Sequence, residues 1–216
     1  MKYHMSPKEY FGKVIELYHN SRKPKFYNPR IRRGRSSSIS SDLEDLTAFF
    51  LALNIHRNCT FYTDQPMRFE GSKPKYPDIV IQESGGKIAH LVDVKTDLGW
   101  NRDGILDFCK KWDSTIGEVK GTKTRFKQGD TKDEMEGYFS KKLKYHIVVI
   151  SKENSGKRVN EHIAKVEAEG FENIFLYFLS ERMHPNAYGM TISDKLHEMM
   201  IHEHEFDRLL KNTAQN

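Results

Sequence analysis

Two adjacent glycines, Gly85 and Gly86, constrain the fold of this chain most strongly, because they separate two short apolar runs. A glycine pair between β-prone residues predicts a tight β-hairpin with a two-residue turn. Pairing the strands outward from that turn sets Asp78 directly opposite Asp93. Opposed side chains have Cβ atoms about 5 Å apart, and two like charges placed there destabilise a sheet. The facing carboxylates therefore predict a bound cation, and a divalent ion held by oxygen ligands is the natural candidate.

A lysine two positions after Asp93 adds a positive charge to this pair. Side chains alternate along a strand, so Lys95 projects from the same face as Asp93, whereas Val92 and Val94 point into a core. This prediction depends on one register, because a slip of one residue would move Asp93 and Lys95 to the opposite face. In the expected register, the hairpin predicts a metal site with an ammonium group beside it.

The rest of the chain predicts an α/β fold. Ser6, Pro7 and Glu9 form a capping box with proline at the first helical position, which predicts the start of a helix. Apolar spacing predicts the later elements, which are a helix from Ser41, a strand at 59–63, helices at 104–116 and 159–169, strands at 145–151 and 173–179, and a helix at 194–210. Residues 117–137 lack an apolar period and predict a long exposed loop or an insertion. This order predicts a central mixed sheet, with an antiparallel hairpin and parallel crossover strands, flanked by helices.

The length of 216 residues suits one well-buried domain. We expect an N-terminal helix and basic arm at 1–40, the core at 41–180 and a C-terminal helical segment at 181–216. No apolar run approaches the roughly 18 residues that a membrane span needs, so we expect no membrane partner. Cys59 and Cys109 are too few for a disulfide framework, and a reduced, cytoplasmic setting is expected.

Basic residues gather between positions 21 and 41, where no acidic residue occurs. Prolines, Gly34 and a run of serines break regular structure in this segment. The candidates for contact with the phosphates of a nucleic acid are Arg30, Arg32, Arg33 and Arg35. The alternative interpretation is a solvated linker. The same two interpretations, a second basic surface or a solvated loop, apply to Lys120, Lys123, Arg125 and Lys127.

The pattern Pro77-Asp78, fourteen intervening residues and then Asp93-Val94-Lys95 resembles the signature of the PD-(D/E)xK nucleases, the restriction-endonuclease-like superfamily. The resemblance implies the common core of that fold for residues 41–179. It also implies that Asp78 and Asp93 bind Mg²⁺, with Mn²⁺ as a substitute, that the Val94 carbonyl is a further ligand, and that Lys95 orients the attacking water. No nucleotide cofactor is implied. A bound metal ion provides hydroxide at neutral pH and neutralises charge on a phosphate.

An acidic residue on the helix before the hairpin is a third candidate ligand. Members of the family often carry such an acid facing the metal, which implies a role for Glu44. A competing explanation is that Glu44 completes a capping box with Ser41, and Asp45 is the alternative ligand. Asp97 shares a face with Lys95 if the strand continues, and it is either an acid that supports the site or a turn carboxylate.

The resemblance leads us to expect a deoxyribonuclease acting on double-stranded DNA, of the type II restriction kind and of prokaryotic or phage origin. Cutting both strands generally requires two active sites, so a homodimer is expected. One alternative is a repair or junction-resolving nuclease with the same site. Another is a non-catalytic DNA-binding protein of the same fold, which Asp78, Asp93 and Lys95 argue against.

Overall fold

A six-stranded mixed sheet forms the centre of the protein in the computed structural model, which describes residues 2–69, 74–99, 103–129 and 131–214. Its first three strands are antiparallel neighbours, β1 (Cys59–Thr63), β2 (Ile79–Glu83) and β3 (Lys87–Lys95). The sheet continues through β5 (Glu134–Val149), which runs parallel to β3. On the far side of β5, its first part pairs with β4 (Lys123–Lys127) and its last part pairs in parallel with β6 (Ile174–Phe178).

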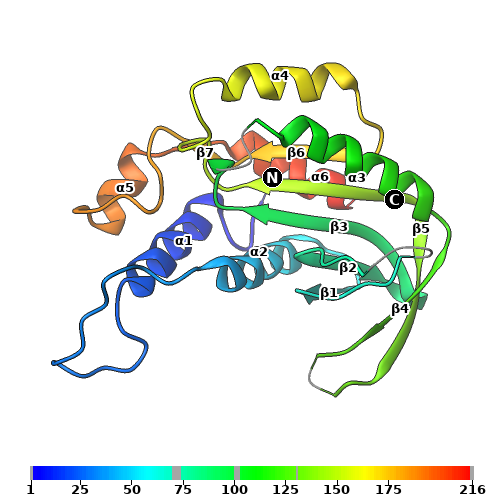
Figure 1. Cartoon of the computed structure of the whole chain (residues 1–216), viewed down its shortest axis with the longest axis horizontal. Helices are drawn as coiled ribbons and strands as arrows, with labels where there is room; N and C mark the ends of the chain where they lie inside the picture. The colour runs from blue at the N-terminus through cyan, green and yellow to red at the C-terminus, as the bar shows by residue number, and fades with distance from the viewer. Residues whose placement is uncertain (1, 70–73, 100–102, 130, 215–216) are drawn as a thin grey trace.

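Helices cover both faces of this sheet (Figure 1). One face packs against α1 (Pro7–Ser21), α2 (Ser40–Asn54) and α6 (Glu203–Ala214), which share an apolar cluster with Val92 and Val94. The other face packs against α3 (Ile105–Val119) and α4 (Val159–Glu169), in a cluster that includes Leu91. The predicted α/β architecture, a mixed sheet flanked by helices, is therefore confirmed.

The β2–β3 hairpin has the predicted register at the end that carries Asp78 and Asp93, but its turn differs from the prediction. Ile79 pairs with Val92, and continuing that register by one residue sets Asp78 opposite Asp93. The turn is not the predicted two-residue loop, because a 3₁₀ turn (Ser84–Gly86) closes the hairpin and a bulge shifts the pairing after Ile81. The bulge and the longer turn compensate each other, so counting from the glycines still finds the right partners.

The start of α1 is confirmed and the start of α2 is not. The Ser6 side chain accepts from the Glu9 backbone N–H and the Glu9 side chain accepts from the Ser6 backbone, the predicted capping box. The second helix begins at Ser40 with Ile39 at the N-cap, and no side chain caps it. Ile39 is buried, so packing of this residue sets the start of α2 in place of a serine cap.

Two predicted segments differ from the structure. Residues 117–137 are not a loop, because they include the end of α3, all of β4 and the first residues of β5. The predicted helix at 194–210 is instead α5 (Ile192–Glu198), a short strand β8 (Met200–Ile201) and α6. The chain is extended at the buried Met199, and β8 pairs with β7 (Ser180–Glu181). In the part of the chain that is described, no helix combines the length and apolarity that a bilayer crossing requires.

Candidate metal centre at the end of the β2–β3 hairpin

The hairpin brings together the three residues that the sequence singled out. Asp78 directly precedes β2, and Asp93 and Lys95 are among the last residues of β3. Lys95 Nζ lies 2.8 Å from Asp93 Oδ1 and 4.0 Å from Asp78 Oδ2. The ammonium group therefore contacts both carboxylates, as their shared strand face requires.

The backbone of Val94 also faces Asp78. Its N–H donates to Asp78 Oδ2 at 2.6 Å. The N–H and C=O of one strand residue point to the same side, whereas those of the next residue point to the other. The Lys95 carbonyl accepts from Ile150 N on the β5 side, so the Val94 carbonyl points toward Asp78. This is the orientation that a metal ligand at Val94 requires.

One carboxylate oxygen has no partner among the described residues. Asp93 is only 5 % exposed, and its Oδ2 is buried without a hydrogen bond. Leaving a buried acceptor unsatisfied costs free energy, and such atoms in a folded protein call for an explanation. A divalent cation would satisfy Asp93 Oδ2, so the donor set of two carboxylates and one carbonyl fits a hard cation such as Mg²⁺.

Burial and repulsion raise the pKa of Asp78 to about 7. The largest cause is removal of the carboxylate from water, and the negative charge of Asp93 adds to it. The Val94 N–H and the Lys95 ammonium oppose the rise but do not cancel it. Without a bound cation, the protein thus pays to keep Asp78 ionised at neutral pH.

Glu44 lies within electrostatic range of this centre. Burial raises its pKa most, followed by the charges of Asp64 and Asp45, while Lys95 lowers it and Asp93 raises it further. The competing capping-box explanation is wrong, because Ser41 is not the N-cap of α2. In the described part of the chain, however, no three His, Cys, Asp or Glu side chains are grouped so that they could hold a metal ion. Glu44 as a metal ligand stays a prediction.

Asp64 is a further acid that the sequence analysis missed. Thr63 pairs with Ile79, and the next backbone bond joins Asp64 N to Asp78 O at 2.9 Å. The row Asp64, Asp78, Asp93 therefore crosses three neighbouring strands. Asp64 has a φ of 45° and an exposed side chain, and its negative charge helps to raise the pKa of Glu44. The register of β1 against β2 was the signal that would have found it.

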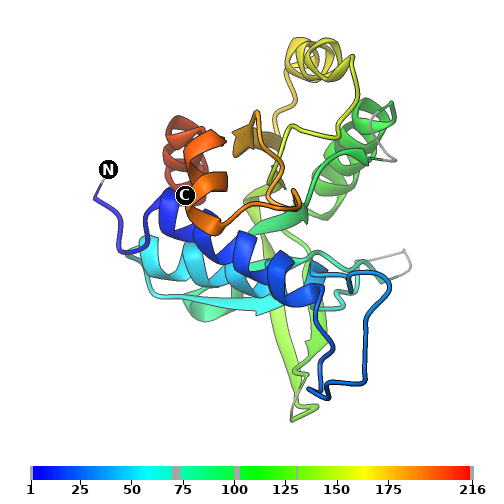
Figure 2. The same cartoon turned by 90° about the vertical axis from the view of Figure 1, so that its left-hand side faces the viewer.

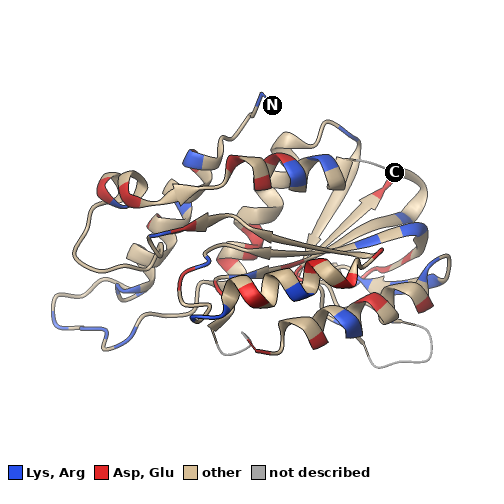
Figure 3. Ribbon diagram, turned by 90° about the horizontal axis from the view of Figure 1, so that it is seen from above, with Lys and Arg blue, Asp and Glu red and all other residues tan. Residues whose placement is uncertain are grey.

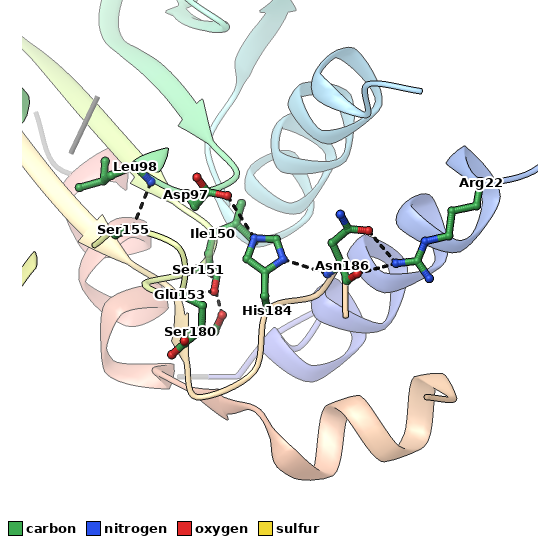
Figure 4. Close-up of polar contacts among 10 residues, drawn as sticks. All are labelled: Arg22, Asp97, Leu98, Ile150, Ser151, Glu153, Ser155, Ser180, His184 and Asn186. Carbon is green, nitrogen blue, oxygen red and sulfur yellow. Dashed lines mark hydrogen bonds and ion pairs between the residues drawn. The ribbon is translucent and has the colours of Figure 1, made fainter. Parts of the chain in front are cut away.

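Asp97 pairs with a histidine, whereas Asp78 and Asp93 pair with Lys95. Its Oδ2 lies 3.2 Å from His184 Nε2, and His184 Nδ1 accepts from Asn186 N at 3.0 Å (Figure 4). Because Nδ1 is an acceptor here, Nε2 carries the hydrogen that is donated to Asp97. Arg22 Nη2 then donates to the Asn186 carbonyl at 2.5 Å. This chain of contacts ties the segment after β3 to the end of α1.

The four candidate arginines are all exposed on the loop between α1 and α2, which carries basic residues along its length (Figure 3). Arg32 and Arg33 donate to main-chain carbonyls, of Pro29 at 2.6 Å and of Lys23 at 3.1 Å. Their charges are therefore not neutralised by these contacts. The end of the loop leads into α2, whereas its tip extends away from the sheet (Figure 1).

Comparison of the chain with protein-family models, with curated proteins and with solved structures gave no match. The resemblance to the PD-(D/E)xK nucleases therefore depends on the motif residues and on the order of the elements. What the geometry itself provides is a pair of facing carboxylates, of which Asp93 is buried and Asp78 is partly buried, with a carbonyl aimed at them and an ammonium group in contact.

Proposed function

We propose that this protein is a Mg²⁺-dependent deoxyribonuclease that hydrolyses phosphodiester bonds of double-stranded DNA. The observation that carries the proposal is the contact of Lys95 with two facing carboxylates, one of which has an unsatisfied buried oxygen. A purely structural ion pair would not need a second carboxylate opposite the first.

Asp78, Asp93 and the carbonyl of Val94 would hold the ion, and the exposed basic loop before α2 would contact DNA phosphates. When bound, the ion supplies a water acidic enough to ionise near neutral pH and positive charge beside the phosphate. Lys95 is one-third exposed, with 36 % of its side chain accessible, so its ammonium group can reach a water or a phosphate oxygen from where it lies. There it would hold the attacking water by a hydrogen bond and offset negative charge that develops in the transition state.

We further propose a restriction-type endonuclease that acts as a homodimer, because the described part of the chain carries one such candidate centre and a double-strand break needs two. Repeated cuts at one sequence would support this narrower proposal. Cuts confined to junctions or damaged DNA would assign the same centre to a repair nuclease instead.

The test is incubation of the purified protein with supercoiled plasmid in Mg²⁺, in Mn²⁺ and in EDTA. We expect nicked and linear DNA with either metal and intact plasmid in EDTA. Sequencing the ends should show 5′-phosphates and 3′-hydroxyls. Failure to cut plasmid, linear duplex and branched DNA with either metal would refute the proposal.

A further inference from the structure

The β4–β5 hairpin presents a row of cations that the proposed metal centre does not use. Along β4, Thr124 and Phe126 are buried, whereas Lys123, Arg125 and Lys127 are exposed. Strand side chains alternate between faces, so the three cations share one face. This face is an ordered surface, because the strand is paired with β5 along its whole length.

Two cavities adjoin the hairpin. One has a volume of about 1000 Å³ and is lined by residues that include Arg68, Lys123 and Tyr138. The other has a volume of about 500 Å³ and is lined by residues that include Lys127 and Lys132. Both are also lined by Arg68, Pro74 and Arg125, so they are two parts of one groove. We call it the hairpin groove.

The charge of the hairpin groove is positive. Its cations are Arg68, Lys123, Arg125, Lys127 and Lys132, and its acids are Asp64, Glu134 and Glu136. Only one pair of these is close, Arg125 Nη2 and Glu136 Oε1 at 3.0 Å, and both side chains are mostly exposed. An exposed pair of this kind is weak, so an incoming phosphate can compete for the arginine.

One end of the hairpin groove reaches the candidate metal centre. Asp64 lines the smaller cavity, and its backbone N–H donates to the Asp78 carbonyl. The next residue, Gln65, donates through Nε2 to the Lys127 carbonyl at 3.1 Å. Further along, Thr124 Oγ1 donates to the Arg68 carbonyl at 2.8 Å. These bonds hold the hairpin against the loop that follows β1, in a fixed position relative to Asp78.

The length and lining of the groove suit a nucleic-acid backbone better than a small anion. Tyr138, in the larger cavity, pairs with Lys87 at the start of β3, six residues before Asp93. At about 3.3 Å per residue, the distance along β3 from Lys87 to Asp93 is about 20 Å. This distance matches the length of about six base pairs of duplex. Tyr76 and Tyr138 are 62 % and 42 % exposed, and each lines one of the two cavities, where a sugar or a base can contact the rings.

We infer that the hairpin groove binds the sugar-phosphate backbone of duplex DNA to one side of the cleavage position, with Lys123 and Arg125 as phosphate contacts. The inference rests on the proposed function. The tips of the β4–β5 hairpin and of the basic loop before α2 both lie on the lower side of the molecule, far apart along it in Figure 1 and close together in Figure 2, so a duplex that runs along this side can meet both.

The test measures binding of the full chain to a duplex of about 30 base pairs, longer than the groove. Binding is followed by fluorescence anisotropy in EDTA, so that it does not depend on cleavage. We expect the double variant Lys123→Gln/Arg125→Gln to bind at least about tenfold more weakly, with a salt dependence lower by about two units, since each lost phosphate contact removes about 0.9.

A matched control removes the same charge elsewhere. In Lys111→Gln/Lys165→Gln, the two lysines are exposed on α3 and α4, and Lys165 loses an ion pair to Glu161 at 2.8 Å just as Arg125 loses one to Glu136. The control should bind like the wild type. Thermal melting followed by circular dichroism checks that both variants are folded.

The outcomes separate the two proposals. Equal binding by the hairpin variant and the control, or no binding by the wild type, overturns the groove as a DNA site, whatever the plasmid assay shows. A selective loss in the hairpin variant supports the groove even if the wild type never cuts, a result that would refute only the nuclease.

Discussion

Asp78 carries the main electrostatic cost of the candidate metal centre. Burial and the facing Asp93 raise its pKa from 3.8 to about 7. The folded protein therefore binds a proton that the unfolded chain releases between these values. This contribution to stability is fully present below pH 3.8 and is lost as pH rises through 7. Above pH 7, Asp78 is ionised in the metal-free protein although it is partly buried and faces the charge of Asp93.

At pH 8 and without metal, Asp78→Asn should therefore raise the free energy of unfolding by about 1–3 kcal/mol. The amide oxygen still accepts from Val94 N, whereas the charge opposite Asp93 is gone. At pH 5 the gain should be much smaller, because Asp78 is then protonated in the wild type. Urea unfolding in EDTA at the two pH values measures both numbers. Equal effects at the two values would contradict the raised pKa of Asp78.

At this scale the sequence was informative about the motif residues and not about their surroundings. Counting from the glycines placed Asp78, Asp93 and Lys95 together because side chains in strands alternate strictly. Asp93 Oδ2 lacks a hydrogen-bond partner among the described residues because of how the neighbouring side chains pack, and no local sequence pattern encodes that packing. Asp64 was missed because its strand pairs with β2 across a long connection.

At the scale of elements, α2 carries the two acids that are candidates for a third ligand, Glu44 and Asp45. It contacts β3 and begins at Ser40, so Glu44 lies in its second turn with a half-buried side chain, whereas Asp45 is exposed. The charges of Lys95 and Asp93 act on Glu44. Burial and charge therefore favour Glu44 over Asp45 as the candidate third acid.

Glu44→Gln should lower the Mg²⁺-dependent cleavage rate by about tenfold, equivalent to about 1.4 kcal/mol of transition-state stabilisation. Asp45→Asn, the matched control on the adjacent residue, should cut within about twofold of wild type. Initial rates of plasmid nicking at saturating Mg²⁺ measure both. A larger loss of rate in Asp45→Asn than in Glu44→Gln would assign the role to Asp45. If neither variant cuts more slowly than the wild type, α2 supplies no acid to the reaction.

The elements that were predicted correctly are those with a local signal. The capping box of α1 and the apolar runs of β3, β6 and the last part of β5 are visible in the sequence without tertiary information, whereas the first part of β5, from Glu134, was not predicted. The segment at 117–137 was mistaken for a loop because charged residues occupy the exposed face of β4, and only Thr124 and Phe126 mark its buried face. The last helix divides at Met199 because β8 pairs with β7, a tertiary contact.

At the scale of the whole molecule, the two-sided packing of the sheet holds the centre in place. Val92 and Val94 are fixed by the cluster with α1, α2 and α6, and Leu91 by the cluster with α3 and α4. Asp93, between Leu91 and Lys95 on one face of a buried central strand, has little freedom to move away from Asp78. Facing carboxylates held by packed strands cost stability while no cation is bound, which is the arrangement that a preorganised cation site would have.

The central claim is that Asp78 and Asp93 hold a divalent ion and Lys95 acts on the water beside it. The most direct measurement compares Mn²⁺ binding by calorimetry with single-turnover plasmid cleavage in wild type, Asp93→Asn and Lys95→Ala. Asp93→Asn should lose both binding and cleavage. Lys95→Ala should keep Mn²⁺ binding and lose cleavage by about 100-fold or more. A wild type that binds no Mn²⁺, or variants that cut as fast as the wild type, would contradict the account.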